Sequence, residues 1–134
     1  MTESTPFIYP VRSANPRPDI QDRWEGAAWC HVPALPIAHF RPESSSHRPF
    51  TQVRLVADDQ RIYGLFRVED RFVRCMHTGF QSPVYKDSCV EFFFSPGDNS
   101  SQGYFNLEMN CGGTMLFHHQ TAPRTNQVHI AEED

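Results

Sequence analysis

The sequence predicts an all-β protein, an antiparallel β-sandwich of the immunoglobulin or jelly-roll kind. Three observations lead to this fold class. The 134-residue chain contains 11 Phe and 11 Pro, a composition typical of strands joined by irregular loops. Short segments in which apolar and polar residues alternate recur along the chain. Turn residues separate these segments, as they do in sandwiches built from antiparallel hairpins.

The first strand pair is expected within residues 51–70. Val53, Leu55 and Ala57 alternate with their neighbours and give this segment one apolar face. Residues 58–60 read Asp-Asp-Gln, which predicts a hairpin turn. The remainder of the segment then returns as the partner strand.

The second strand pair is expected at residues 88–95 and 103–110, joined by a turn that contains Pro96 and Gly97. The face expected to be buried carries Val90, Phe92, Phe94, Phe105, Leu107 and Met109. A further strand is expected to begin at Thr114, after a second glycine-containing turn.

The rest of the chain is less strongly patterned. Residues 1–22 are polar and contain several prolines, so we expect an N-terminal arm, and residues 23–134 are expected to form one sandwich domain. Trp24 and Trp29 flank a short turn in which packing explains them better than exposure does. Short strands are also expected within 35–40 and 72–77.

Charge and hydropathy restrict the partners. The net charge is −4 and the arginines are scattered, whereas nucleic-acid binding usually needs a basic face. No apolar run is long enough to span a membrane. We therefore expect neither nucleic acid nor membrane as a partner, and a neutral polar ligand fits the charge better than a polyanion.

The N-terminus lacks a cationic stretch followed by an apolar one, so no signal peptide is predicted and a cytoplasmic location is the default expectation. The four cysteines show no Cys-x-x-Cys spacing. Without a secretory signal they are expected to be free thiols.

Polar side chains gather on the other face of the second strand pair. This face carries Tyr104, Asn106, Glu108 and Asn110, with Glu91 on the neighbouring strand and Tyr85, Lys86 and Asp87 at its entrance. Sugar hydroxyls need both donors and acceptors, which amides, carboxylates and ammonium groups supply. The apolar side of a pyranose ring needs a flat aromatic surface. The alternative interpretation is an ordinary solvated sheet face, which antiparallel sheets commonly have.

The strand-turn-strand order carries a resemblance to a known family. The segments VRLVADDQRIYGLFRVED, DSCVEFFFSP and YFNLEMNCGG follow Trp24 and Trp29. In this order they resemble the carbohydrate-binding family 9-like proteins, relatives of the DOMON-type sandwiches. The resemblance covers residues 24–118, and the second and third segments are its specific parts.

The resemblance implies non-catalytic binding of a sugar or glycan end. It implies a stacking role for Tyr85, where sugar-binding members usually have Trp, and hydroxyl bonding by Glu91. Residues Asn106, Glu108 and Asn110 would line the same face, flanked by Lys86 and Asp87. Complete members continue with further strands, so the resemblance predicts a fold incomplete at its C-terminus. The exposed sheet edge left there is where a homo-oligomer would form.

Several other functions are compatible with single features. Glu91 and Glu108 could be a glycosidase pair, which requires two carboxyl groups across a cleft. Haem would need axial ligands, for which Met76, Met109 and His118 are available. Assembly through the same sheet without sugar affinity is the remaining competing class.

No cofactor is predicted. His118-His119 and Cys75-x-His77 do not complete a set with zinc-ligand spacing. Structural calcium is left open because Asp58, Asp59 and Asp98 lie in predicted turns. Turn chemistry alone accounts for aspartate at these three positions, so no metal ligand is assigned.

Overall fold

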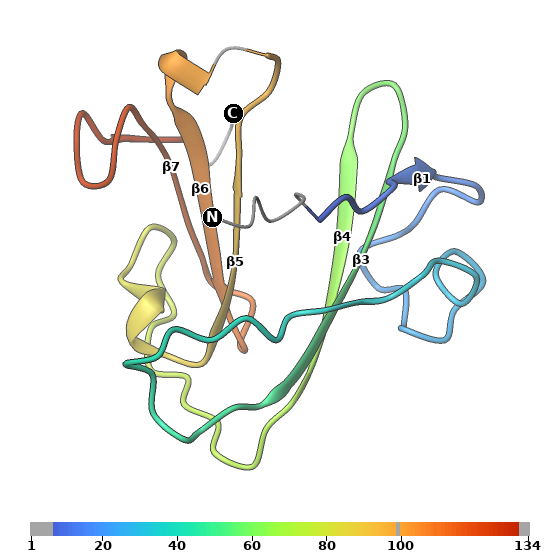
Figure 1. Ribbon diagram of the computed structural model, residues 1–134, viewed down its shortest axis with the longest axis horizontal. Helices are drawn as coiled ribbons and strands as arrows, with labels where there is room; N and C mark the ends of the chain where they lie inside the picture. The colour runs from blue at the N-terminus through green and yellow to red at the C-terminus, as the bar shows by residue number, and fades with distance from the viewer. Residues whose placement is uncertain (1–6, 99, 132–134) are drawn as a thin grey trace, which may run out of the picture. The chain divides into compact units, whose positions relative to one another are not determined.

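The computed structural model describes residues 7–98 and 100–131 and is drawn in Figure 1. The chain divides into two compact units: residues through Asp70 form unit 1, and residues from Arg71 onward form unit 2. Each unit holds one four-stranded sheet, and no α-helix occurs among the described residues. These two largely antiparallel sheets confirm the predicted all-β sandwich class. The predicted boundary between an arm and a domain at residues 22 and 23 stays a prediction.

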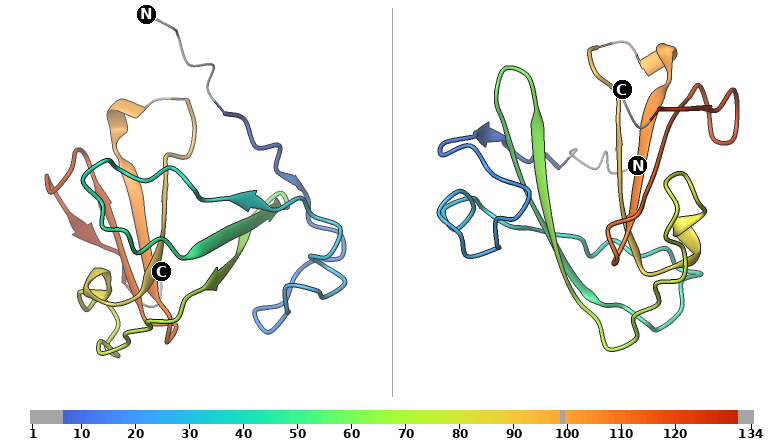
Figure 2. Two further views of the ribbon diagram at one scale, coloured as in Figure 1. Left: turned by 60° about the horizontal axis from the view of Figure 1, so that its bottom comes forward. Right: turned by 180° about the vertical axis from the view of Figure 1, so that it is seen from behind.

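Unit 1 is built around its third strand. Its strands are β1 (Arg12–Ser13), β2 (Leu35–Pro36), β3 (Phe50–Ala57) and β4 (Ile62–Glu69). β3 and β4 form the long antiparallel hairpin seen in both views of Figure 2. β2 also pairs antiparallel with β3, but β1 pairs with it in parallel. The expectation of purely antiparallel pairing is therefore wrong for this one short strand.

The core of unit 1 lies on the face of β3 that carries Val56. Val56 packs with Ala28, Trp29 and Val32, and all four are buried. Val53, on the other face, is buried as well, so the alternation identified only one of two buried faces. The face that the alternation did not identify is the one that carries Val56, and it is buried because the segment around Trp29 covers it. The packing role expected for Trp29 is confirmed.

Unit 2 holds the second sheet, in the order β5-β6-β7-β8. Its strands are β5 (Cys89–Phe94), β6 (Tyr104–Asn110), β7 (Met115–Gln120) and β8 (Val128–His129), with short 3-10 helices η1 (Val84–Lys86) and η2 (Ser100–Gln102). All strand pairs are antiparallel. The predicted strands at 88–95, 103–110 and from Thr114 are confirmed, but residues 72–77 form no strand. The backbone there bonds instead to the segment before β5: the Arg74 carbonyl accepts the Ser88 N–H, and Asp87 Oδ2 accepts the N–H groups of Met76 and His77.

Aromatic rings cover the apolar face of this second sheet. Phe94 stacks on Phe92 and on Phe105, each with ring centroids 5.3 Å apart. Phe117 on β7 continues the row, 5.8 Å from Phe105. Because side chains alternate along a strand, this packing directs the intervening residues to the opposite face. The polar residues of β6 are thereby fixed on one side of the sheet.

Gly103 sets the entry into β6. Its φ of +89° lies in the left-handed region, and a Cβ there would lie 2.9 Å from the His119 ring and closer still to the Gln120 carbonyl. Only glycine combines this backbone conformation with such a close approach to β7. Gly103 therefore helps to hold β6 and β7 in the register that aligns their polar side chains.

Candidate functional site

The polar face of unit 2 is buried. Asn106, Glu108 and Asn110 on β6 are 4%, 7% and 4% exposed, and His118 and Gln120 on β7 are similarly covered. The register places Asn106 opposite His118 and Tyr104 opposite Gln120. An ordinary solvated sheet face would leave these side chains exposed, so that alternative interpretation is contradicted. A buried polar row must instead find its partners within the protein or in a ligand.

A chain of amide and imidazole contacts runs along this row. The Gln120 amide donates to the Tyr104 hydroxyl at 2.8 Å, and the Gln127 amide donates to Gln120 Oε1 at 3.0 Å. Asn106 Nδ2 donates to Glu108 Oε1 at 3.0 Å and lies 3.1 Å from His118 Nε2. Each contact restricts a rotamer, so the row is preorganised without any ligand.

Three atoms of the row are buried without a hydrogen-bond partner: Asn106 Oδ1, Glu108 Oε2 and His118 Nδ1. The amide nitrogen of Asn106 only donates, so His118 Nε2 is the acceptor and its proton sits on Nδ1. The face therefore offers one unused imidazole donor beside two unused oxygen acceptors. Leaving such groups unpaired costs about 1–3 kcal/mol each. A ligand that hydrogen-bonds to them removes this cost.

Glu91 adds a second carboxylate at the β5 side of the row, directly opposite Glu108 in the register. Partial burial and the charge of Glu108 raise the pKa of Glu91, while a contact from the Cys89 thiol lowers it. Next along β5, Phe93 is 50% exposed and its ring lies 6.0 Å from that of Tyr104. Phe93 thus provides an open aromatic surface beside the polar row.

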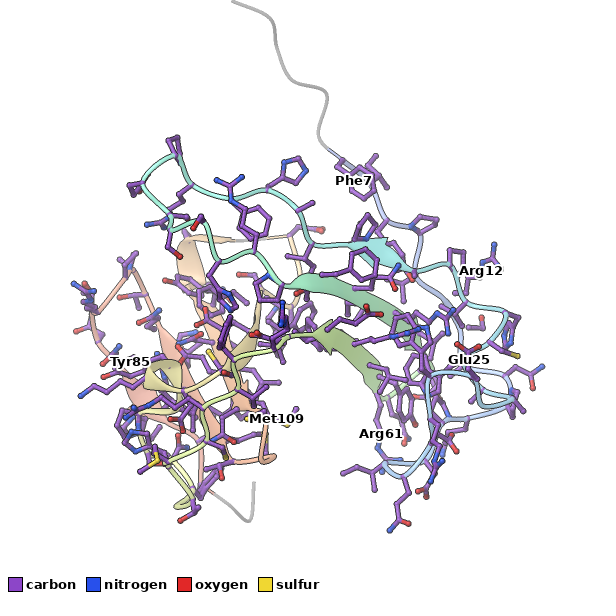
Figure 3. All side chains as sticks on the ribbon, turned by 90° about the horizontal axis from the view of Figure 1, so that it is seen from below. Phe7, Arg12, Glu25, Arg61, Tyr85 and Met109 are labelled. Atoms are coloured by element: carbon purple, nitrogen blue, oxygen red, sulfur yellow. The ribbon has the colours of Figure 1, made fainter. Side chains whose placement is uncertain are left out.

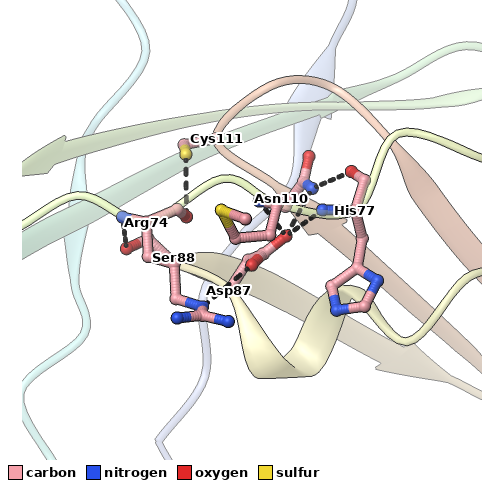
Figure 4. A network of polar contacts seen from close by, with 7 residues as sticks. Arg74, His77, Asp87, Ser88, Asn110 and Cys111 are labelled. Carbon is pink, nitrogen blue, oxygen red and sulfur yellow. Dashed lines mark hydrogen bonds and ion pairs between the residues drawn. The ribbon is translucent and has the colours of Figure 1, made fainter.

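Asp87 and Asn110 form a separate cluster of polar contacts (Figure 4). Asp87 Oδ2 accepts the N–H groups of Met76 and His77 and the Asn110 amide. Asn110 Oδ1 accepts the N–H groups of Gly112 and Thr114, which closes the β6–β7 turn. The other Asp87 oxygen lies 3.4 Å from Arg74 Nε. These two residues therefore hold the chain segments around the face in place.

Tyr85 and Lys86 lie on η1, which packs against β6 through the fully buried Val84. Tyr85 is 55% exposed. Figure 3 shows it on the opposite side of the sheet from Met109, which belongs to the apolar face. The structure thus brings the predicted Tyr85, Lys86, Glu91, Asn106 and Glu108 to one side of unit 2.

This chain is similar to carbohydrate-binding proteins of a known family. A sequence model described as carbohydrate-binding family 9 matches residues 27–133. The chain belongs to carbohydrate-binding family 9. Domains of such families are binding modules without catalytic activity, so the predicted class of non-catalytic carbohydrate binding is confirmed.

A solved structure has a fold similar to that of this chain. It is the crystal structure of a candidate carbohydrate-binding protein from Bacteroides uniformis, with a TM-score of 0.69 and 25% sequence identity. The match covers 76% of this chain but 45% of the other, so the chain spans less than half the length of that protein. No curated protein matches the chain.

Part of the candidate site was not predicted from the sequence. His118, Gln120 and Gln127 contribute to the buried network but were not among the predicted binding residues. His118 and Gln120 alternate on β7 as Asn106 and Glu108 do on β6, so extending the same alternation by one strand would have found them. Gln127 carried no such signal, because it reaches the row from the loop before β8.

Asp58, one of the three candidate calcium residues, already has partners within the protein. Asp58 accepts three bonds from Gln60, Arg61 and Tyr63, and Arg17 lies 2.9 Å away. Among residues 7–98 and 100–131, no three His, Cys, Asp or Glu side chains form a metal-holding group. No helix of these residues is long and apolar enough to cross a membrane.

Proposed function

We propose that the polar face of unit 2 binds the end of a neutral glycan without cleaving it. The observation that carries this proposal is the trio of unpartnered buried atoms, Asn106 Oδ1, Glu108 Oε2 and His118 Nδ1. A sugar hydroxyl donates one hydrogen bond and accepts others. Two adjacent hydroxyls can therefore satisfy two oxygen acceptors and one N–H donor together.

The charge of the face favours a neutral polyol over an anion. Glu91 and Glu108 are the ionisable acids of the row, and they face each other across β5 and β6. A carboxylate or phosphate ligand would add a third negative charge there. Hydroxyl hydrogens instead complement carboxylate oxygens, and hydrogen bonds to charged groups are the stronger kind, about 1.5–3 kcal/mol each.

Two exposed aromatic rings supply stacking surfaces in this proposal. Tyr85 on η1 is 55% exposed and Phe93 on β5 is 50% exposed. A pyranose presents its C–H face to such a ring, which adds apolar contact to the polar bonds. We assign the stacking role to Tyr85, with Phe93 extending the surface beside Asn106, and we place Lys86 at the rim.

Asp87 and Asn110 act as supports in the same proposal. Their bonds to residues 76–77 and 112–114 fix the segments that flank the face. We also propose, from the same strand pairs, that the chain is related to the DOMON-type sandwiches. This relation is compatible with sugar binding and does not lead us to propose a further ligand.

A glycan array tests the proposal, with wild type, Tyr85→Ala and the control Phe7→Ala. Phe7 belongs to unit 1 and is 74% exposed, so its removal changes exposed apolar surface outside the residues of the proposed site. We expect wild type and the Phe7 variant to bind the same glycans and Tyr85→Ala to lose most of the signal. Absence of binding by wild type, or equal binding by Tyr85→Ala, would refute the stacking assignment. Turnover of a chromogenic glycoside that disappears in Glu91→Gln would refute non-catalytic binding.

A further inference from the structure

Two thiols from distant parts of unit 2 lie side by side. Cys75 belongs to the connection before η1, and Cys111 is the first residue after β6. The neighbouring Cys75 thiol is, after burial, the next cause of the raised pKa of Cys111. The Cys111 thiol also donates to the Arg74 carbonyl at 3.4 Å. The Cys75 sulfur lies against Gly112, 2.5 Å from where a Cβ would be. Each sulfur therefore contacts the residue next to the other cysteine.

The backbone holds the two segments together independently of the thiols. The Ser88 N–H donates to the Arg74 carbonyl and the Cys111 N–H donates to the Ser88 carbonyl, both at 2.9 Å. The Arg74 N–H donates to Ser88 Oγ at 2.9 Å. Figure 4 shows Arg74, Ser88 and Cys111 in this arrangement. Because Ser88 bonds to both segments, the cysteines stay neighbours in the reduced protein.

We propose that Cys75 and Cys111 form a reversible disulfide that locks the connection before η1 onto the β6–β7 turn. Both side chains are exposed, so a small disulfide such as oxidised glutathione can reach them. The Cys75 thiolate attacks one glutathione sulfur and releases one glutathione thiolate. The Cys111 thiolate then attacks the Cys75 sulfur of the mixed disulfide and releases the second. Two cysteine thiols are oxidised to one disulfide, their two protons pass to the two released glutathione thiolates, and one glutathione disulfide is thereby reduced to two thiols.

The other cysteines make this pair specific. Burial, with the charges of Glu91 and Glu108, raises the pKa of Cys89 to about 12, so that thiol is rarely a thiolate and is a poor nucleophile. Cys30 lies in unit 1. Burial and the neighbouring Cys75 thiol raise the pKa of Cys111, so its thiolate forms less readily than that of an ordinary cysteine.

The bond would change the part of unit 2 that flanks the polar face. The connection it anchors contains Met76 and His77, whose N–H groups bind Asp87, and it leads into η1 with Tyr85. A cross-link between this connection and the turn restricts their separation in partly unfolded states. The pair is thus a thiol-disulfide control on the rigidity of this segment.

Thiol counting and peptide mapping test the proposal. Wild type is incubated with oxidised glutathione, and free thiols are then counted after denaturation. Digestion combines trypsin, which cuts after Arg74 and Lys86, with a glutamate-specific protease, which cuts after Glu91 and Glu108 and so separates Cys89 from Cys111. The same treatment is applied to Cys75→Ser, Cys111→Ser and the control Cys30→Ser, with dithiothreitol added afterwards.

We expect the free thiols of wild type to fall from four to two, with the Cys75 peptide joined to the Cys111 peptide. Dithiothreitol should restore all four. Cys30→Ser should form the same bond, and the other two variants should form none. Wild type that keeps four thiols, carries only glutathione adducts or links any other pair would overturn the proposal.

Discussion

Glu91 and Glu108 lie directly opposite each other on β5 and β6, on the same face of the sheet. Partial burial is the main cause of the raised pKa of Glu91, and the charge of Glu108 adds to it. The folded protein therefore holds two carboxylates in a position that disfavours the ionised form of one of them. Such a pair is a destabilising feature unless a ligand supplies hydrogen-bond donors.

Replacing Glu91 by Gln is expected to stabilise the free protein at neutral pH. A carboxyl group whose pKa is raised by folding stabilises the folded state at low pH, and that contribution is lost as the pH rises through the folded pKa. Glu91→Gln has no carboxyl group at this position, so its stability does not fall in this way as the pH rises. Urea denaturation of both proteins at about pH 7 and about pH 4 measures the effect, and the difference in midpoint should shrink at the lower pH.

Glu43→Gln is the control for this experiment. Glu43 is exposed on unit 1, 4.0 Å from Arg41, so its replacement changes the net charge equally without altering the polar face. A Glu91 variant less stable than wild type at neutral pH would contradict the pKa argument.

Asn110→Ala is expected to destabilise unit 2 by about 3 kcal/mol or more. The variant leaves two backbone N–H groups and part of the Asp87 carboxylate without partners, and each buried unpaired group costs about 1–3 kcal/mol. Denaturant unfolding monitored by far-UV circular dichroism measures the loss in the free energy of unfolding. A change below about 0.5 kcal/mol would show that these bonds do not hold the β6–β7 turn.

Arg54 is expected to stabilise unit 1 through Trp24. Its guanidinium carbon lies 4.0 Å from the centroid of the Trp24 ring, and Nη1 donates to the Trp24 carbonyl at 2.6 Å. Arg54→Ala should cost about 2–5 kcal/mol, the sum of a cation–π contact and a hydrogen bond to a charged group. Arg61→Ala, which removes an exposed arginine of the β3–β4 turn, is the control in the same denaturation assay and should unfold like wild type.

Gly103→Ala is expected to disturb the pairing of β6 with β7. Alanine at a φ of +89° is strained, and its Cβ would collide with the Gln120 carbonyl and the His119 ring. The cost should exceed about 1 kcal/mol, visible as a lower melting temperature. Gly97→Ala is the matched comparison, because Gly97 has a φ of +86° with no atom near the added Cβ. Equal losses in the two variants would show that backbone strain, and not the contact with β7, is responsible.

Alternation within a strand was enough to predict the second sheet. The residues of β5 and β6 divide cleanly into an apolar and a polar set, and the structure gives each set its own face. The same reasoning failed at Val56, because the segment that covers it is remote in sequence and supplies the burial.

The burial of the polar row could also not be predicted from the alternation of polar and apolar residues. An alternating strand predicts a polar face but not whether other chain segments cover it. Here Gln127 and Asp87 bond to Gln120 and Asn110 at the two ends of the row, and both approach from outside the strands. The roles of Asp87 and Asn110 likewise depend on partners at residues 76–77 and 112–114, which no spacing within the strand reveals.

The unpartnered atoms of Asn106, Glu108 and His118 are the central feature of the proposed sugar site. Titration calorimetry of the preferred array glycan against wild type and Asn106→Ala tests it directly, with Arg61→Ala as control and circular dichroism to verify folding. We predict that the folded Asn106 variant binds at least about tenfold more weakly, a loss of about 1.4 kcal/mol or more, while the control matches wild type. A folded Asn106→Ala protein with unchanged affinity would contradict the assignment of this face as the sugar site.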